Sequence, residues 1–200
     1  MSPASSSRGA RPAGLAAQHM PHASPAAAAS PTQPGPQPGT PATASSLYRD
    51  AEAALAARDL ALADRRLASL LTQFPESALL DQALYERARI AYQRHAWTDA
   101  QRQLDQLATI SASPLAEPGA YLACRIAFEA SDRGAQTCLV NYRTRYPHSP
   151  HDLEVLGLLT ELAYRDGGCA SARARTTELI RLYTDTALAD GWRHRCPVVP

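Results

Sequence analysis

Apolar residues recur at spacings of three and four along most of the chain, beginning at Leu47. A turn at Asp59 follows the first run, and the second run ends at Pro75, which cannot continue a helix. Three more pairs of runs come next, with turns at residues 95–96, 131–134 and 167–168. A last short run covers residues 187–195 and stops before Pro197. The pattern predicts four helical hairpins and one final helix.

Small residues occupy two matched places in each predicted hairpin. In the second helices they are spaced 37, 35 and 37 residues apart, at Ala63, Ala100, Ala135 and Ala172. Twelve residues before each of these, in the first helices, lie Ala51, Ala88, Ala123 and Thr160. A fixed period in the mid-thirties is typical of stacked helical hairpins. The small side chains would let the two helices of each hairpin approach closely.

The first 46 residues have a different composition. They contain nine of the sixteen prolines and almost no large apolar side chain, which predicts a disordered tail or linker before a repeat domain over residues 47–200. Pro21 and Pro25 would interrupt the amphipathic helix of a transit peptide, and no secretory signal pattern is present. Such a linker is also how envelope proteins space a domain from a membrane anchor, and that anchor would then lie upstream of this sequence.

The distribution of charged residues indicates which class of partner the protein can bind. Arg8 and Arg11 are the only charged residues of the first 46, so the remaining 154 carry 18 of the 20 arginines and all 19 acidic residues. This near-neutral balance argues against nucleic-acid binding. No apolar run approaches the roughly 20 residues that span a membrane.

The two sets of small residues, with the closing prolines Pro75 and Pro147, resemble the tetratricopeptide repeat (TPR) family. The resemblance covers residues 47 to about 196. It implies an all-α right-handed superhelix, an α-solenoid, of about four hairpins with a capping helix at the C-terminus. The chain departs from the family pattern because the first-helix Trp and the Gly-Tyr signature are mostly absent, and the second and fourth repeats lack the closing proline.

Two segments, FPESALLDQALYERA and YPHSPHDLEVLGLLTELA, are similar to a bacterial envelope subgroup of this family. That subgroup includes the outer-membrane-assembly lipoprotein with a TPR fold and the periplasmic coordinator of the Tol–Pal system. The resemblance implies a location in the periplasm or cell envelope. The lipidated cysteine of the lipoproteins has no counterpart in this sequence.

The family also implies a recognition face, because the first helices of TPR hairpins line a concave surface that holds a peptide or helix of a protein partner. In this chain that face would present Tyr48, Tyr85, Arg89, Tyr92, Tyr121, Phe128, Glu161 and Tyr164, together with Glu52. Five of the eight tyrosines fall in this set, and tyrosine suits recognition surfaces. The alternative is that several of these rings pack between hairpins as core. Arg89 is the single basic member, which argues against a clamp for acidic C-terminal peptides.

The four cysteines suggest two local pairs. Cys124 and Cys138 lie seven residues either side of Ser131, so they should sit level in an antiparallel hairpin. Cys169 opens the second helix of the fourth hairpin, and Cys196 ends the helix that should cover it. Disulfides would indicate an oxidising compartment, whereas buried thiols acting as small hydrophobes are the alternative. The alternative function is a cytoplasmic regulatory or redox-responsive domain, in which the cysteine pairs would switch the stability of the C-terminal hairpins.

The sequence offers no support for catalysis. It contains no CxxC pair, no Ser/His/acid or Cys/His signature and no phosphate-binding glycine loop, and the His148–His151 spacing is common by chance. We therefore expect neither a cofactor nor a metal, and we expect a non-enzymatic interaction scaffold.

Overall fold

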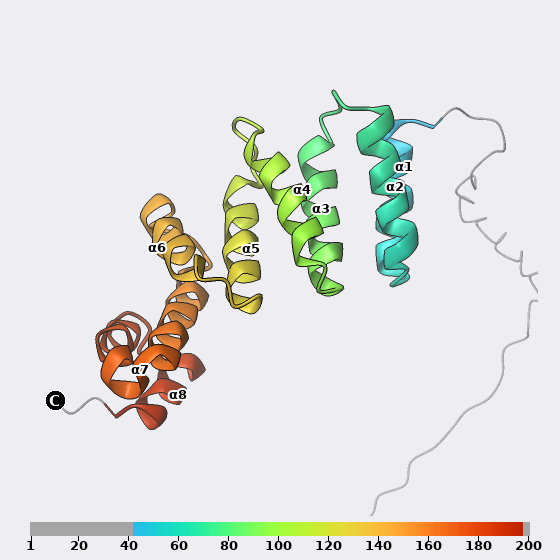
Figure 1. Ribbon diagram of the computed structural model, residues 1–200. Coiled ribbons are helices and arrows are strands. Elements are labelled where there is room, and N and C mark those ends of the chain that lie inside the picture. Colours follow the sequence, from blue (N-terminus) through green and yellow to red (C-terminus); the bar gives the residue numbers. More distant parts are fainter. Residues whose placement is uncertain (1–41, 198–200) are drawn as a thin grey trace, which may run out of the picture. The chain divides into compact units, whose positions relative to one another are not determined.

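The computed structural model describes residues 42–197, and this range contains eight helices and no strand (Figure 1). The helices are α1 (Ala44–Ala56), α2 (Leu60–Gln73), α3 (Leu80–Gln93), α4 (Trp97–Ala108), α5 (Ala116–Glu129), α6 (Ala135–Arg145), α7 (Asp152–Leu182) and α8 (Ala187–Arg195). The all-helical prediction is confirmed for this range. Most of the predicted disordered tail, residues 1–41, lies outside it.

The first helix begins earlier than the sequence pattern indicated. Thr43 and Ser46 form a capping box, in which each side chain bonds the backbone N–H of the other at 3.1 and 2.9 Å. Helix α1 therefore starts at Ala44, three residues before Leu47, where the sequence pattern placed the beginning of the repeat domain. The cap was missed because it is built from the small polar residues that end the low-complexity stretch.

The long helix α7 is two helices joined by a glycine turn. Gly167 and Gly168 leave the helical conformation, with φ of −161° and 63°. Leu156 on one side of this turn and Leu179 on the other belong to the same buried cluster. Residues 152–166 and 169–182 thus form the fourth hairpin, with its turn where the sequence predicted it.

Each helix packs chiefly against its neighbours in the sequence. The hairpins are α1–α2, α3–α4, α5–α6 and the two parts of α7, and α8 packs against the last of them. The alanines at the predicted close approaches are fully buried or nearly so: Ala63, Ala100, Ala135 and Ala172. The core is divided into four clusters of buried side chains that follow one another along the chain, as expected when each hairpin buries surface only against its neighbours.

The first three hairpin turns share a feature of backbone geometry. The second residue after the first helix has a positive φ, at Arg58, His95 and Ser131, with φ between 56° and 59°. The fourth turn differs, because Gly168 combines a φ of 63° with a ψ of −154°. After α1, the N–H of Arg58 bonds the carbonyl of Leu55, and the N–H of Asp59 bonds that of Ala54. This is the Schellman arrangement that closes a helix end. Three of the four hairpins therefore hold a non-glycine residue in a conformation that favours glycine.

Serine side chains close the connections between hairpins. Ser77, Ser113 and Ser149 are 36 residues apart, and each hydroxyl accepts the backbone N–H two residues ahead. Two of them also reach back to the first helix of the preceding hairpin. Ser113 donates to Asp81 at 2.8 Å, and Ser149 donates to Glu117 at 2.6 Å. These bonds fix how each hairpin begins relative to the one before it.

We predict that Ala100→Leu lowers the free energy of unfolding by about 1–3 kcal/mol, because no space for a larger side chain remains beside the fully buried Ala100. Chemical denaturation would measure the change. Ala108→Leu, at the exposed C-terminal end of the same helix, is the control and should change stability little. Equal losses at both positions would contradict the close approach at Ala100.

We also predict that Arg58→Gly raises the free energy of unfolding by about 0.5–1 kcal/mol, since glycine adopts positive φ without the steric cost that arginine has there. Ala57→Gly, one residue earlier where φ is −78°, should bring no gain. Thermal or urea unfolding of both variants tests this prediction. A stability loss in Arg58→Gly would show that the contacts of the arginine side chain stabilise the fold by more than the strain of the positive φ destabilises it.

Candidate recognition surface

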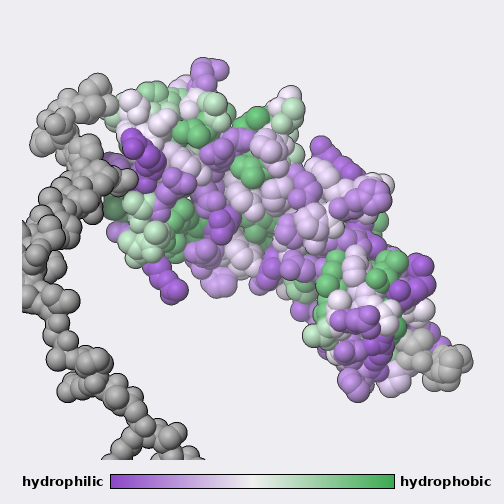
Figure 2. All heavy atoms as spheres, turned by 180° about the vertical axis from the view of Figure 1, so that it is seen from behind, coloured by the Kyte–Doolittle hydropathy of each residue, from purple (hydrophilic) through white to green (hydrophobic). Residues whose placement is uncertain are grey.

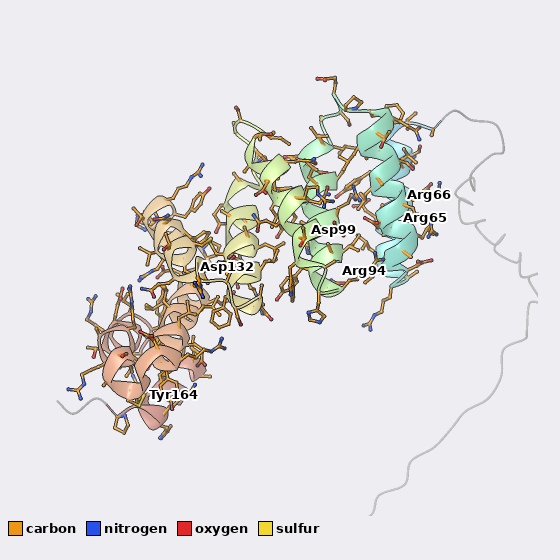
Figure 3. All side chains as sticks on the ribbon, in the orientation of Figure 1. Arg65, Arg66, Arg94, Asp99, Asp132 and Tyr164 are labelled. Atoms are coloured by element: carbon orange, nitrogen blue, oxygen red, sulfur yellow. A yellow bond between two sulfur atoms is a disulfide. The ribbon has the colours of Figure 1, made fainter. Side chains whose placement is uncertain are left out.

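The residues predicted to form the recognition face all lie on the first helices of the hairpins, but they are not equally accessible. Glu52 and Arg89 are exposed, Tyr121 is buried, and the others are half-buried: Tyr48, Tyr85, Tyr92, Phe128, Glu161 and Tyr164. Tyr164 lies in the first part of α7 (Figure 3). We call the side of the described domain formed by α1, α3, α5 and residues 152–166 the first-helix face.

Arginines stack on three equivalent rings of this face. The rings of Tyr92, Phe128 and Tyr164 are 36 residues apart in sequence. Each lies beneath a guanidinium from the next helix along the face: Arg125 over Tyr92 at 5.8 Å, Arg165 over Phe128 at 4.6 Å and Arg195 over Tyr164 at 3.8 Å. We call these three pairs the arginine–aromatic ladder. The ladder links α3 to α5, α5 to α7, and α7 to α8.

Acidic side chains hold the ladder arginines in place. Glu161 accepts hydrogen bonds from Arg165 at 3.0 Å and from Arg195 at 2.8 Å. At the other end, Glu129 accepts the Tyr92 hydroxyl at 2.8 Å and pairs with Arg125. The three arginine side chains nevertheless remain 42–50% exposed. A guanidinium carries five N–H donors, so part of their hydrogen-bonding capacity faces solvent.

Tyr121 is the least accessible of the residues predicted to form the recognition face. Only 8% of the residue is exposed, and its ring stacks on His151 with centroids 4.1 Å apart. Its hydroxyl donates to Glu154 and accepts from Arg125 at 3.1 Å. Burial, reinforced by the bond to Glu154, raises the pKa of Tyr121 to about 12. Tyr121 therefore belongs to the interface between the third and fourth hairpins, which was the alternative interpretation of these rings.

A hollow of about 620 Å³ opens where the face ends. Its walls come from α5, the first part of α7, and α8. Its large apolar and aromatic lining residues are Tyr121, Phe128, Leu158, Leu188 and Trp192. Leu188 is 36% exposed, an unusual level for a leucine. Arg125, Arg195, Glu154 and Glu161 also line it, so that charged groups surround an apolar floor. We call this the C-terminal hollow.

One residue in the lining of the hollow, Gly157, differs from the equivalent residues of the earlier repeats. Residues 85, 121 and 157 are equivalent positions 36 apart, and the first two are tyrosines whereas the third is glycine. A Cβ atom on Gly157 would lie 2.7 Å from Cδ2 of Leu188. Leu188 of α8 therefore packs against the backbone of α7 at the position where the earlier repeats carry a tyrosine ring. Sequence reasoning treated α8 only as a cover and so missed Leu188, Trp192 and Arg195, and it also missed Leu158 of α7.

A second, smaller group of predicted residues meets near the other end of the face. Tyr48 and Arg89 line a hollow of about 180 Å³ between α1 and α3, together with Glu52 and Glu86. Arg89 pairs with Glu86 at 2.9 Å and lies 6.0 Å from the ring centre of Tyr85. The structure thus divides the predicted residues into two groups rather than one continuous site.

The opposite side of the domain also carries a hollow, of about 300 Å³, between α4, α5 and α6. Its floor is made of small residues of α5, namely Ala116, Gly119, Ala120 and Ala123. The side of the molecule in Figure 2 is mainly hydrophilic, with smaller hydrophobic areas between the charged side chains. Tyr142, Arg145 and Tyr146 also line the hollow between α4, α5 and α6, and the Arg145 guanidinium lies 5.4 Å from the ring centre of Tyr146, so an arginine–aromatic pair is found there as well.

Both cysteine pairs suggested by the sequence are present as disulfides. Cys124 is bonded to Cys138 and Cys169 to Cys196. Within residues 42–197 no group of three or more His, Cys, Asp or Glu side chains is arranged to hold a metal ion. Among the helices of this range, none is both long enough and apolar enough to cross a bilayer.

We predict that Tyr121→Phe weakens the response of the domain to alkaline pH. A folded-state pKa of about 12, above the ordinary 10.0, gives a stabilising contribution that is complete below pH 10 and is lost as the pH rises to 12. The thermal midpoint of the variant should therefore fall less steeply than that of the unmodified protein across this interval. Parallel curves would contradict the buried, hydrogen-bonded state of the Tyr121 hydroxyl.

No protein-family model matches the chain, and no curated protein matches it.

Proposed function

We propose that this protein is a non-catalytic scaffold that holds a peptide or helix of a protein partner on its first-helix face. The four hairpins would form a right-handed superhelix of the TPR type, with that face on the concave side. Three features support this architecture: the repeat period, the buried alanines at each helix approach and the packing of each helix on its neighbours in sequence.

The observation that carries the proposal is the C-terminal hollow. Its volume of about 620 Å³ is within the range of ligand pockets and leaves room for more than one large side chain. An amphipathic segment could place two apolar side chains against Phe128 and Leu158, with Trp192 and Leu188 as the opposite wall. Anchors of this kind, aromatic residues at the centre of a hollow, dominate the energy of many interfaces.

The charged residues around the hollow indicate which polar groups a partner would need there. Arg125 and Arg195 retain N–H groups toward solvent, whereas both carboxylate oxygens of Glu161 already accept hydrogen bonds from arginines. The rim can therefore donate more hydrogen bonds than it can accept. A partner with carboxylate or exposed carbonyl oxygens beside its apolar side chains fits this rim, because each oxygen would pair with a guanidinium.

We place this function in an oxidising compartment, the bacterial cell envelope. The two disulfides support that assignment, since disulfides persist in such compartments. The balanced charge of the repeat region supports a protein partner rather than a nucleic acid.

The proposal is tested by site-specific photo-crosslinking followed by binding measurements. A photoreactive residue at Leu158, in the hollow, should crosslink one defined segment of a partner, whereas one at Arg102 on α4 should not. With that segment as a synthetic peptide, Phe128→Ala should weaken affinity by about 1–2 kcal/mol and Arg102→Ala by less than about 0.5 kcal/mol. Thermal midpoints of both variants control for unfolding. Equal crosslinking at both positions, or equal affinity losses, would refute the proposal.

A further inference from the structure

Helix α8 is a wall of the C-terminal hollow and also the last helix of the described domain. It contributes Leu188, Trp192 and Arg195 to the lining. Immediately after it comes Cys196, which is bonded to Cys169 at the start of the second part of α7. The disulfide therefore ties the free end of the wall to the hairpin that the wall covers.

The non-covalent hold on α8 is limited. The helix has nine residues, fewer than an isolated helix needs to be stable in water. Only Ala189 and Trp192 of this helix are buried, and Leu188 contacts the backbone of Gly157 while remaining partly exposed. Arg195 adds its stacking on Tyr164 and its ion pair with Glu161 at the surface. Two of these four side chains, Trp192 and Arg195, lie in the half of α8 next to Cys196.

We infer that the Cys169–Cys196 disulfide is a reducible latch, whose opening releases α8 and dismantles the C-terminal hollow. Loss of α8 removes Trp192 and Leu188 from one side of the hollow and Arg195 from its rim. It also removes the last pair of the arginine–aromatic ladder. The consequence for partner binding rests on the proposed function, whereas the latch itself can be tested without any partner.

The chemistry requires a dithiol reductant. Its thiolate attacks the sulfur of Cys169, which is the exposed end of the bond, while Cys196 is 3% exposed. A mixed disulfide forms at Cys169, and Cys196 leaves as a thiolate that takes up a proton. The second thiol of the reductant then displaces Cys169 as a thiol. Two electrons and two protons pass to the protein, and the reductant becomes its own disulfide.

The other disulfide provides an internal comparison. Cys124 and Cys138 join α5 to α6, and these helices also pack through Leu139 and Tyr142 in a buried cluster. The two bonded cysteines are 14 residues apart in sequence, against 27 for the Cys169–Cys196 bond. Reduction of Cys124–Cys138 should therefore leave both helices in place.

The test is hydrogen exchange on the full chain, comparing oxidised protein, protein reduced with dithiothreitol, Cys169→Ser/Cys196→Ser and Cys124→Ser/Cys138→Ser. Exchange of the α8 amides should accelerate on the order of 100-fold in the reduced protein and in the terminal double variant. It should stay unchanged in the internal double variant, and amides of α1 to α4 should be unaffected throughout. In a Trp97→Phe background, Trp192 emission should shift to the red under the same conditions, because that ring is buried only while α8 is docked.

The latch is refuted if, after reduction, the exchange rates of the α8 amides stay within about threefold of those in the oxidised protein and the emission maximum of Trp192 shifts by no more than a few nanometres. Equal acceleration in both double variants refutes it as well, since the effect would then be general loosening.

Crosslinking at Leu158 before and after reduction separates the two proposals. Loss of crosslinks on reduction supports the latch as a control on binding, and their persistence overturns that control. Absence of crosslinks in oxidised protein contradicts the proposed function, while hydrogen exchange still decides the latch.

Discussion

The close approach of paired helices at single alanines is the constraint on which the rest of this structure depends. Ala63, Ala100, Ala135 and Ala172 are buried between helices with no space for a larger side chain. Because the same contact recurs at nearly the same interval, it sets the offset between one hairpin and the next. That offset determines which side chains of neighbouring first helices meet. The arginine–aromatic ladder and the hollow are consequences of this spacing.

The ladder shows how a repeated scaffold produces a surface that is not uniform. Equivalent rings receive an arginine from the next helix, so each pair joins two repeats. At the end of the array the next helix is α8, which is short and has no partner helix of its own. Gly157 stands where earlier repeats have tyrosine, and Leu188 of α8 packs against it at the border of the C-terminal hollow. The proposed binding residues therefore lie together at the C-terminal end of the described repeats, in the hollow lined by α5, α7 and α8.

Features that depend on the repeat period and on local backbone geometry could be predicted from the sequence. The hairpins, the close-approach alanines and the turn at residues 167–168 follow from spacing alone. The burial of Tyr121 did not follow, because its ring stacks on His151 from the loop before α7, and helical periodicity carries no information about that loop. The stacking of Arg165 on Phe128 and of Arg195 on Tyr164 could not be predicted either, because the pattern of apolar residues does not show where a long, flexible arginine side chain will lie. The start of α1 was missed for a compositional reason, a capping box inside a low-complexity stretch.

The position of the recognition face is the central claim, and the hydrogen-exchange footprint of a bound partner segment tests it most directly. Exchange would be compared for the full chain with and without the crosslinked segment supplied as a peptide. Protection should appear in α5, in residues 152–166 and in α8, the helices that line the C-terminal hollow. Protection centred instead on α4 and α6, around the hollow on the opposite side of the domain, would contradict the account.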